Sequence, residues 1–131
     1  MAKVTVKFES KRLLSRMQIA WELVNETDLP RAFDYEIGAA KWEWVGETQR
    51  RNGSIVTSPR SIVDQGDLAD SYDRQKAGKK SYVHSWDVDY AMATHEGAQL
   101  KNRGLIYPRP WTEEPREAIP EMFAYRFRAA Q

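Results

Sequence analysis

A broad apolar stripe close to the start of the sequence restricts most strongly what this chain can fold into. Its residues recur at spacings of three and four, as on one face of an α-helix: Leu13, Met17, Ala20, Trp21 and Val24. Further apolar side chains widen this face: Leu14, Ile19 and Leu23. The predicted helix, residues 11–25, therefore needs neighbours on more than one side.

The segments on either side of this helix carry their own patterns. Before it, Val4, Val6 and Phe8 alternate with polar residues, which predicts a half-buried strand, and Ser10 is a suitable N-cap for the helix. After it, Asp28 is predicted to start a second helix with Pro30 in the first turn. This helix should end near residue 45. Its apolar stripe consists of Phe33, Ile37, Ala40 and Trp44.

The middle of the chain changes from helical to strand patterns. Residues 46–60 are rich in turn formers and predict a long exposed loop with a tight turn at Asn52-Gly53. Two strands are then predicted on either side of Ala77-Gly78. The second strand alternates cleanly and places one row of side chains on the same face: Tyr82, His84, Trp86, Val88 and Tyr90. His84 is thus expected within an aromatic row.

The last third of the chain predicts a polar loop at 98–104, a short strand at 105–107 and a final helix. Pro108 and Pro110 lack amide donors, so the chain there is extended or turned, and Thr112 is expected to cap the helix. Pro115 and Pro120 interrupt the early helical sequence. We expect either one kinked helix or a short turn followed by a helix from about residue 119 to residue 129.

Length and composition indicate one globular domain of 131 residues, with 41% hydrophobic and 30% charged residues. We divide it into a strand and two helices (1–45), a long loop (46–60), a β-hairpin and sheet (61–111) and a C-terminal helix (112–131). The prediction is an α+β fold, in which an antiparallel β-sheet has an N-terminal helical pair and a C-terminal helix packed on one face. No apolar run approaches the ~20 residues that a bilayer crossing needs, and no secretory signal pattern is present, so no membrane partner is expected.

Catalytic and metal sites find little support in the residue types and their spacing. The chain has no cysteine and only two histidines. On a strand over 82–90, His84 points away from Asp87 and Asp89, and His95 and Glu96, being adjacent, cannot share a strand face. We therefore predict no catalytic residue, no metal ligand and no cofactor, and interpret Tyr90–Gly97 as a strand end and turn in which His95 makes a capping or interface hydrogen bond.

The net charge of +1 comes from interspersed signs and predicts no extended phosphate-binding face. One local exception is the segment 74–80, which holds Arg74, Lys76, Lys79 and Lys80 and no acidic residue. A charged hairpin end can contact nucleic acid, but it can equally be a solvated edge that discourages aggregation.

The order of motifs in residues 58–128 resembles the minor tail and neck proteins of tailed bacteriophages, the tail-completion or head-tail connector family. A polar residue, Gly66, a spacer, Leu68 and Ser71 precede the hairpin. Tyr90-Ala91 is followed by Glu96-Gly97, and Arg109-Pro110-Trp111 leads into the last helix. In physical terms the two glycines permit unusual backbone angles. Leu68 and Tyr90 are expected to pack the sheet against its helix, and Glu96 is expected to accept hydrogen bonds from a turn.

This resemblance implies a structural virion protein, made in the host cytoplasm, that forms a homo-oligomeric ring of six copies at the head-tail junction or tail top. Its partners would be other neck and tail proteins, and packaged DNA would pass through or abut the ring without sequence-specific binding. The residues expected at subunit contacts or the lumen are Arg50, Arg51, Arg74, Lys76, Lys79, Lys80, His95, Glu96, Lys101, Arg103, Arg109 and Trp111.

Two alternatives stay open at the level of sequence. The first is a tail terminator protein, also a ring, that caps the tail tube. The second is a small hydrolase or a nucleic-acid-binding regulator, in which Arg12, Arg16, Arg50 and Arg51 would contact phosphate.

Overall fold

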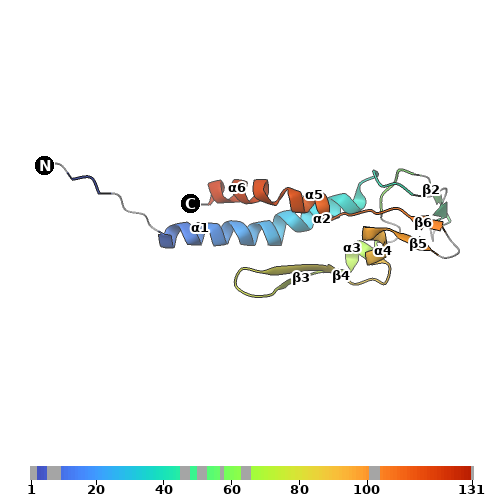
Figure 1. Ribbon diagram of the computed structural model, residues 1–131, viewed down its shortest axis with the longest axis horizontal. Coiled ribbons are helices and arrows are strands. Elements are labelled where there is room, and N and C mark those ends of the chain that lie inside the picture. Colours follow the sequence, from blue (N-terminus) through green and yellow to red (C-terminus); the bar gives the residue numbers. More distant parts are fainter. Residues whose placement is uncertain are drawn as a thin grey trace.

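A computed structural model describes residues 3–5, 10–44, 48–49, 53–56, 58–62, 66–100 and 104–130. The molecule is elongated, with a pair of long helices at one end and short strands and loops at the other (Figure 1). The predicted α+β class, with antiparallel strands, an N-terminal helical pair and a C-terminal helix, is confirmed.

The N-terminal helices form one continuous rod. α1 (Ser10–Leu23) passes through a π-helical turn, η1 (Val24–Asp28), directly into α2 (Leu29–Gly38). The predicted break at Asp28 is wrong, because the Leu29 amide reaches back five residues to the Val24 carbonyl and the backbone stays helical. Asp28 makes no capping bond, and its carboxylate instead accepts two hydrogen bonds from Arg126, at 2.7 and 3.1 Å.

α2 ends at Gly38, well before the predicted end near residue 45. Ala39 has an extended backbone, and the Trp42 indole folds back to donate its N–H to the Glu36 carbonyl at 2.6 Å. This bond satisfies one of the carbonyls that a helix end leaves without a partner. Trp44 consequently lies in a loop and not on the predicted helical stripe.

The C-terminal region follows the second of the two predicted alternatives, since α6 (Ile119–Ala129) comes after a short segment. That segment is itself helical, α5 (Glu113–Glu117). α6 lies alongside α1 (Figure 1), and Arg16 of α1 donates to the carbonyls of Phe127 and Ala130, both at 2.9 Å. A cation at these carbonyls also complements the negative end of the helix dipole.

The described strands form three separate antiparallel pairs. β3 (Tyr72–Lys76) pairs with β4 (Tyr82–Trp86) in the predicted hairpin, whose turn spans residues 77–81. β1 (Thr48–Gln49) pairs with β2 (Ile55–Val56) inside the segment predicted as loop, and β5 (Ala98–Leu100) pairs with β6 (Gly104–Ile106) where a polar loop was expected. Residues 3–5 are exposed and form no strand, and the rest of the predicted first strand lies outside the described residues.

The stretch predicted as a strand end, Tyr90–Gly97, is instead mostly helical, as α4 (Ala91–Glu96). β4 stops at Trp86 because the chain turns over the next four residues, where the Ala91 amide bonds to the Val88 carbonyl at 3.1 Å. Tyr90 is 44% exposed and therefore does not plug the sheet as expected. Gly97 ends the helix with φ +80°, as the sequence predicted for this glycine.

The core lies where the rod meets the hairpin and the entry to α5. Its buried apolar residues are Val24, Leu29, Phe33, Ile37, Ile62, Leu68 and Trp111. The Phe33 ring contacts Trp86 edge-on at 5.0 Å and His84 at 5.4 Å, so it joins α2 to β4. Leu68 enters the core from α3 (Asp67–Asp70), a short helix that follows Gly66 at φ +86°. This core role of Leu68 matches the sequence-based expectation.

The chain exposes more surface than a compact protein of the same mass. The chain exposes 9818 Å², whereas a compact protein of 15.2 kDa exposes about 7,100 Å². Within α1 the apolar stripe is buried at Ala20 and Val24, each 0% exposed, but open at Leu14, which is 59% exposed. Among the described residues, no helix is long and apolar enough to cross a membrane.

Candidate interaction surface and buried polar sites

The basic hairpin tip is divided between the rod and solvent. Arg74 donates to the Glu26 carbonyl at 3.2 Å, and Lys76 lies 3.8 Å from the Glu22 carboxylate, so both side chains turn toward the rod. Lys79 and Lys80 are exposed at the turn. The tip therefore presents fewer cations outward than its sequence suggests.

His84 sits in the aromatic row that the sequence predicted, stacked on Tyr72 with ring centroids 5.9 Å apart. Asn25, in the π-turn, donates to the Trp21 carbonyl at 2.9 Å, which aims its Oδ1 at His84 Nε2, 3.0 Å away. Since Oδ1 only accepts, Nε2 carries the proton and Nδ1 accepts from the Tyr72 hydroxyl at 2.6 Å. Burial, followed by the nearby Arg74 charge, lowers the pKa of His84. The group is a satisfied polar chain inside the core.

His95 and Glu96 meet, which the argument from strand geometry did not allow. At the end of α4, His95 Nδ1 donates to the Glu96 carboxylate at 2.6 Å, and Nε2 lies 2.7 Å from the Thr112 hydroxyl. The ring stands edge-on to Trp111 at 4.9 Å. Thr112 makes no capping bond to α5, and its hydroxyl joins α4 to the start of α5 through His95. His95 thus makes its hydrogen bonds within the chain, to Glu96 and to Thr112, the residue before α5, and the role of His95 and Glu96 at a subunit contact or the lumen stays a prediction.

The same three groups stand in the order hydroxyl, imidazole, carboxylate that nucleophilic hydrolases use, beside an open pocket of about 320 Å³. Two observations favour a structural role. The Glu96 side chain is 68% exposed, so water screens its charge, and the Glu113 amide is bonded to the Pro110 carbonyl at 3.1 Å instead of facing the pocket as an oxyanion donor.

Arg109 and Trp111, predicted at subunit contacts or the lumen, are buried, at 4% and 2% exposure, and this part of the prediction is wrong. Trp111 is in the core. The Arg109 guanidinium lies 3.4 Å from the centre of the Trp44 ring, and Arg60 lies 3.3 Å from the same centre. Burial, with the charge of Arg60, lowers the pKa of Arg109 to about 10, which leaves it charged at neutral pH. The stack fixes the loop after α2 to the segment before α5.

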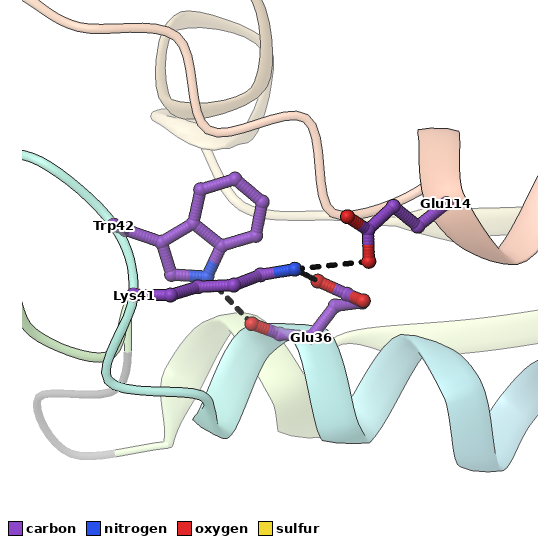
Figure 2. Close-up of polar contacts among 4 residues, drawn as sticks. All are labelled: Glu36, Lys41, Trp42 and Glu114. Carbon is purple, nitrogen blue, oxygen red and sulfur yellow. Dashed lines mark hydrogen bonds and ion pairs between the residues drawn. The ribbon is translucent and has the colours of Figure 1, made fainter.

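A second ion cluster joins the end of α2 to α5. Figure 2 shows the Lys41 ammonium between the carboxylates of Glu36 and Glu114, the latter at 3.1 Å. Burial raises the pKa of Glu36, while the Glu36 contact and Lys41 lower the pKa of Glu114. Burial alone would lower the pKa of Lys41, but its two carboxylate partners outweigh that effect and raise it. The cluster holds α5 against the rod.

The remaining predicted contact residues, Arg50, Arg51, Lys101 and Arg103, lie outside the described residues. Within the described part of the chain, no group of three or more His, Asp or Glu side chains is placed to hold a metal ion.

The chain matches no protein-family model, no curated protein and no solved structure. We therefore base the functional proposal on the sequence and on the surface and buried groups of the structure.

Sequence reasoning missed the two ion clusters, because their members come from distant parts of the chain and no local pattern marks them. It also missed the uncovered apolar surface of α1, which we call the α1 strip and define as Leu13, Leu14 and Met17. The breadth of the helical stripe gave the signal, since it indicated neighbours on more than one side of the helix.

Proposed function

We propose that the chain is a structural virion protein of the tailed-bacteriophage neck. It forms a homo-oligomeric ring, with six copies expected, at the head-tail junction or tail top, completes the tail and joins it to the DNA-filled head. It acts through its surfaces and catalyses no reaction. The basis is the resemblance over residues 58–128 together with the large exposed surface of a single copy.

The observation that carries this proposal is the α1 strip. Leu13, Leu14 and Met17 are 47%, 59% and 40% exposed, although Ala20 and Val24 further along the same rod are completely buried. Contiguous exposed apolar side chains typically mark a contact with another protein. The excess of about 2,700 Å² over a compact chain is also comparable to the area that specific protein interfaces bury.

The motif residues of the family resemblance have scaffold roles that fit such a subunit. A side chain at Gly97 would place its Cβ 2.9 Å from the Ile106 carbonyl oxygen, so the glycine lets the end of α4 lie close to the end of β6. Leu68 and Trp111 lie in the core. Arg16, which the nucleic-acid alternative assigned to phosphate, is instead bonded to the end of α6.

The solution mass and electron micrographs of the purified chain test this function. We expect self-association that increases with concentration and closed rings of one size in negative stain. A stable dimer of fixed mass over the whole concentration range would contradict the proposal.

Labelling virions with an antibody against the chain separates the neck from its alternative. Label at the head-tail junction of whole virions is expected, and label elsewhere on the virion would contradict the proposal. Label on isolated tails, before any head has joined and with tail length lost when the chain is absent, would instead favour the tail terminator.

A further inference from the structure

The α1 strip stays 40–59% exposed although α1 has neighbours on two sides. On one side α6 is held by Arg16. On the other, the hairpin reaches α1 only as far as Trp21, whose indole N–H donates to the Lys80 carbonyl at 2.9 Å. The first half of α1 extends beyond this contact, and the hairpin turn ends partway along the helix (Figure 1). The partner that fits the α1 strip is therefore an elongated apolar segment.

The segment before α1 has that character. In an extended conformation, the sequence of residues 3–8 would place Val4, Val6 and Phe8 on one side. Residues 3–5 are exposed and lie away from the rest of the molecule (Figure 1), and Val4 is 89% exposed. Val4 and the α1 strip are therefore both exposed in a single copy.

The spacings of the two surfaces agree. Alternate residues of an extended chain lie about 6.7 Å apart, so Val4, Val6 and Phe8 span about 13 Å. Along a helix, residues four apart are separated by about 6 Å, and the distance from Leu13 to Trp21 is about 12 Å. Two successive side chains of the segment, about 6.7 Å apart, thus match the α1 strip from Leu13 to Met17, which is about 6 Å long, and the third would reach the level of Trp21.

We propose that residues 3–8 of one copy lie on the α1 strip of a second copy, so that neighbouring subunits exchange their N-terminal segments. This inference deepens the proposed ring and rests on it for the number of copies. The occupant is a second copy of this chain, because its own sequence supplies both apolar surfaces, and Val4 and the α1 strip are exposed in a single copy.

The absence of cysteine from the chain allows a direct test. Val4→Cys and Leu14→Cys are made as separate single variants, one carrying a mass tag, and are mixed at high concentration and oxidised. A disulfide between the two variants can form only between copies. We expect the mixed product to exceed the products of each variant alone.

A matched control replaces Leu14→Cys by Arg31→Cys, which is exposed on α2 away from the strip. Equal cross-linking of Val4→Cys to both positions would show random collision and overturn the exchange. The double variant Val4→Cys/Leu14→Cys gives a third readout. If it closes internally and runs as a monomer while the single variants do not join, the segment folds onto its own strip and the proposal is wrong.

Leu14→Glu provides an independent measurement in the absence of oxidant. Because Leu14 is 59% exposed, the fold should be retained, while self-association weakens by at least about tenfold. Unchanged association contradicts the inference.

The outcomes separate this inference from the proposed function. Closed rings without the mixed disulfide would retain the neck function and overturn segment exchange. The mixed disulfide in a species that never closes into a ring would retain the exchange and contradict the neck function.

Discussion

At the scale of single residues, Gly97 shows most directly how one position shapes the chain. Its φ of +80° is accessible to glycine and unfavourable for other residues, and the Ile106 carbonyl and Pro108 ring leave a Cβ no room. The turn that joins α4 to β5 depends on this absence of a side chain.

Gly97→Ala should lower the free energy of unfolding by about 2 kcal/mol, because it combines positive φ with steric overlap. Urea unfolding followed by circular dichroism measures the loss. Gly38→Ala is the matched control, since nothing lies within 4 Å of its Cβ position and its φ is not positive. That variant should be neutral or slightly stabilising. Equal losses for the two variants would refute this explanation.

Lys41→Met should destabilise the protein in a pH-dependent manner. Without the ammonium, the buried Glu36 carboxylate faces Glu114 unpaired, and its pKa rises further above 4.5. At about pH 7 we expect a loss of about 1–2 kcal/mol, which shrinks at about pH 4 because Glu36 is then protonated in both the folded and unfolded states. Unfolding at both pH values tests this. Lys79→Met, in the exposed turn, should change little at either pH.

His84 should make the fold sensitive to mild acid. Its pKa is lowered from 6.5 by burial, so the unfolded chain binds the proton first as the pH falls. Stability is therefore fully present above about pH 6.5 and declines below it. His84→Gln removes this titration and should flatten the decline in the urea midpoint. An identical pH profile for the variant would exclude His84 as its source.

At the scale of elements, local patterns predicted what local contacts determine. The helix over 119–129 and the hairpin on either side of Ala77-Gly78 are confirmed because each pattern is matched by packing on one face. The alternation from Tyr82 to Trp86 continues in the sequence to Tyr90, but the strand does not, since a turn at 87–90 redirects the chain. Nothing within residues 82–90 distinguishes these two outcomes.

The side-chain sites divide in the same way. The aromatic row around His84 follows from strand alternation and was predictable. The Arg60, Trp44 and Arg109 stack was not, because it forms only when the loop after α2 meets the segment before α5. Neither segment has a periodic pattern.

The contact between α1 and α6 leads to a prediction for Arg16. Arg16→Met removes two hydrogen bonds to the last carbonyls of α6 and the cation that complements its dipole. We expect a loss of about 1–2 kcal/mol in the free energy of unfolding. Arg12→Met, exposed one turn earlier on α1, should have little effect. If both arginines contacted phosphate instead, the two variants would weaken DNA binding alike and leave stability unchanged.

At the scale of the whole molecule, a large surface and a near-neutral charge occur together. We expect the net charge of +1 and the inward-turned Arg74 and Lys76 to give the chain little general attraction for DNA. Weak attraction suits a ring through which DNA passes, because each phosphate contact would add affinity for the DNA.

The salt dependence of DNA binding tests this distribution of charge. With only Lys79 and Lys80 directed outward from the hairpin, the logarithm of affinity for duplex DNA should fall with the logarithm of salt at a slope of about −2. A slope of about −4 or steeper would contradict this distribution of charge. Lys79→Ser/Lys80→Ser should abolish most of the dependence.

The π-helical turn between α1 and α2 sets the direction in which the side chains of α2 point around the helix axis. One additional residue within this turn rotates α2 by about 100° relative to an uninterrupted helix, and that rotation directs Phe33 toward β4. Removing a single residue from Val24–Asp28 would straighten the rod yet aim the second half of it in the wrong direction. Natural variation in length should therefore accumulate in the connecting loops and be rare in these five positions.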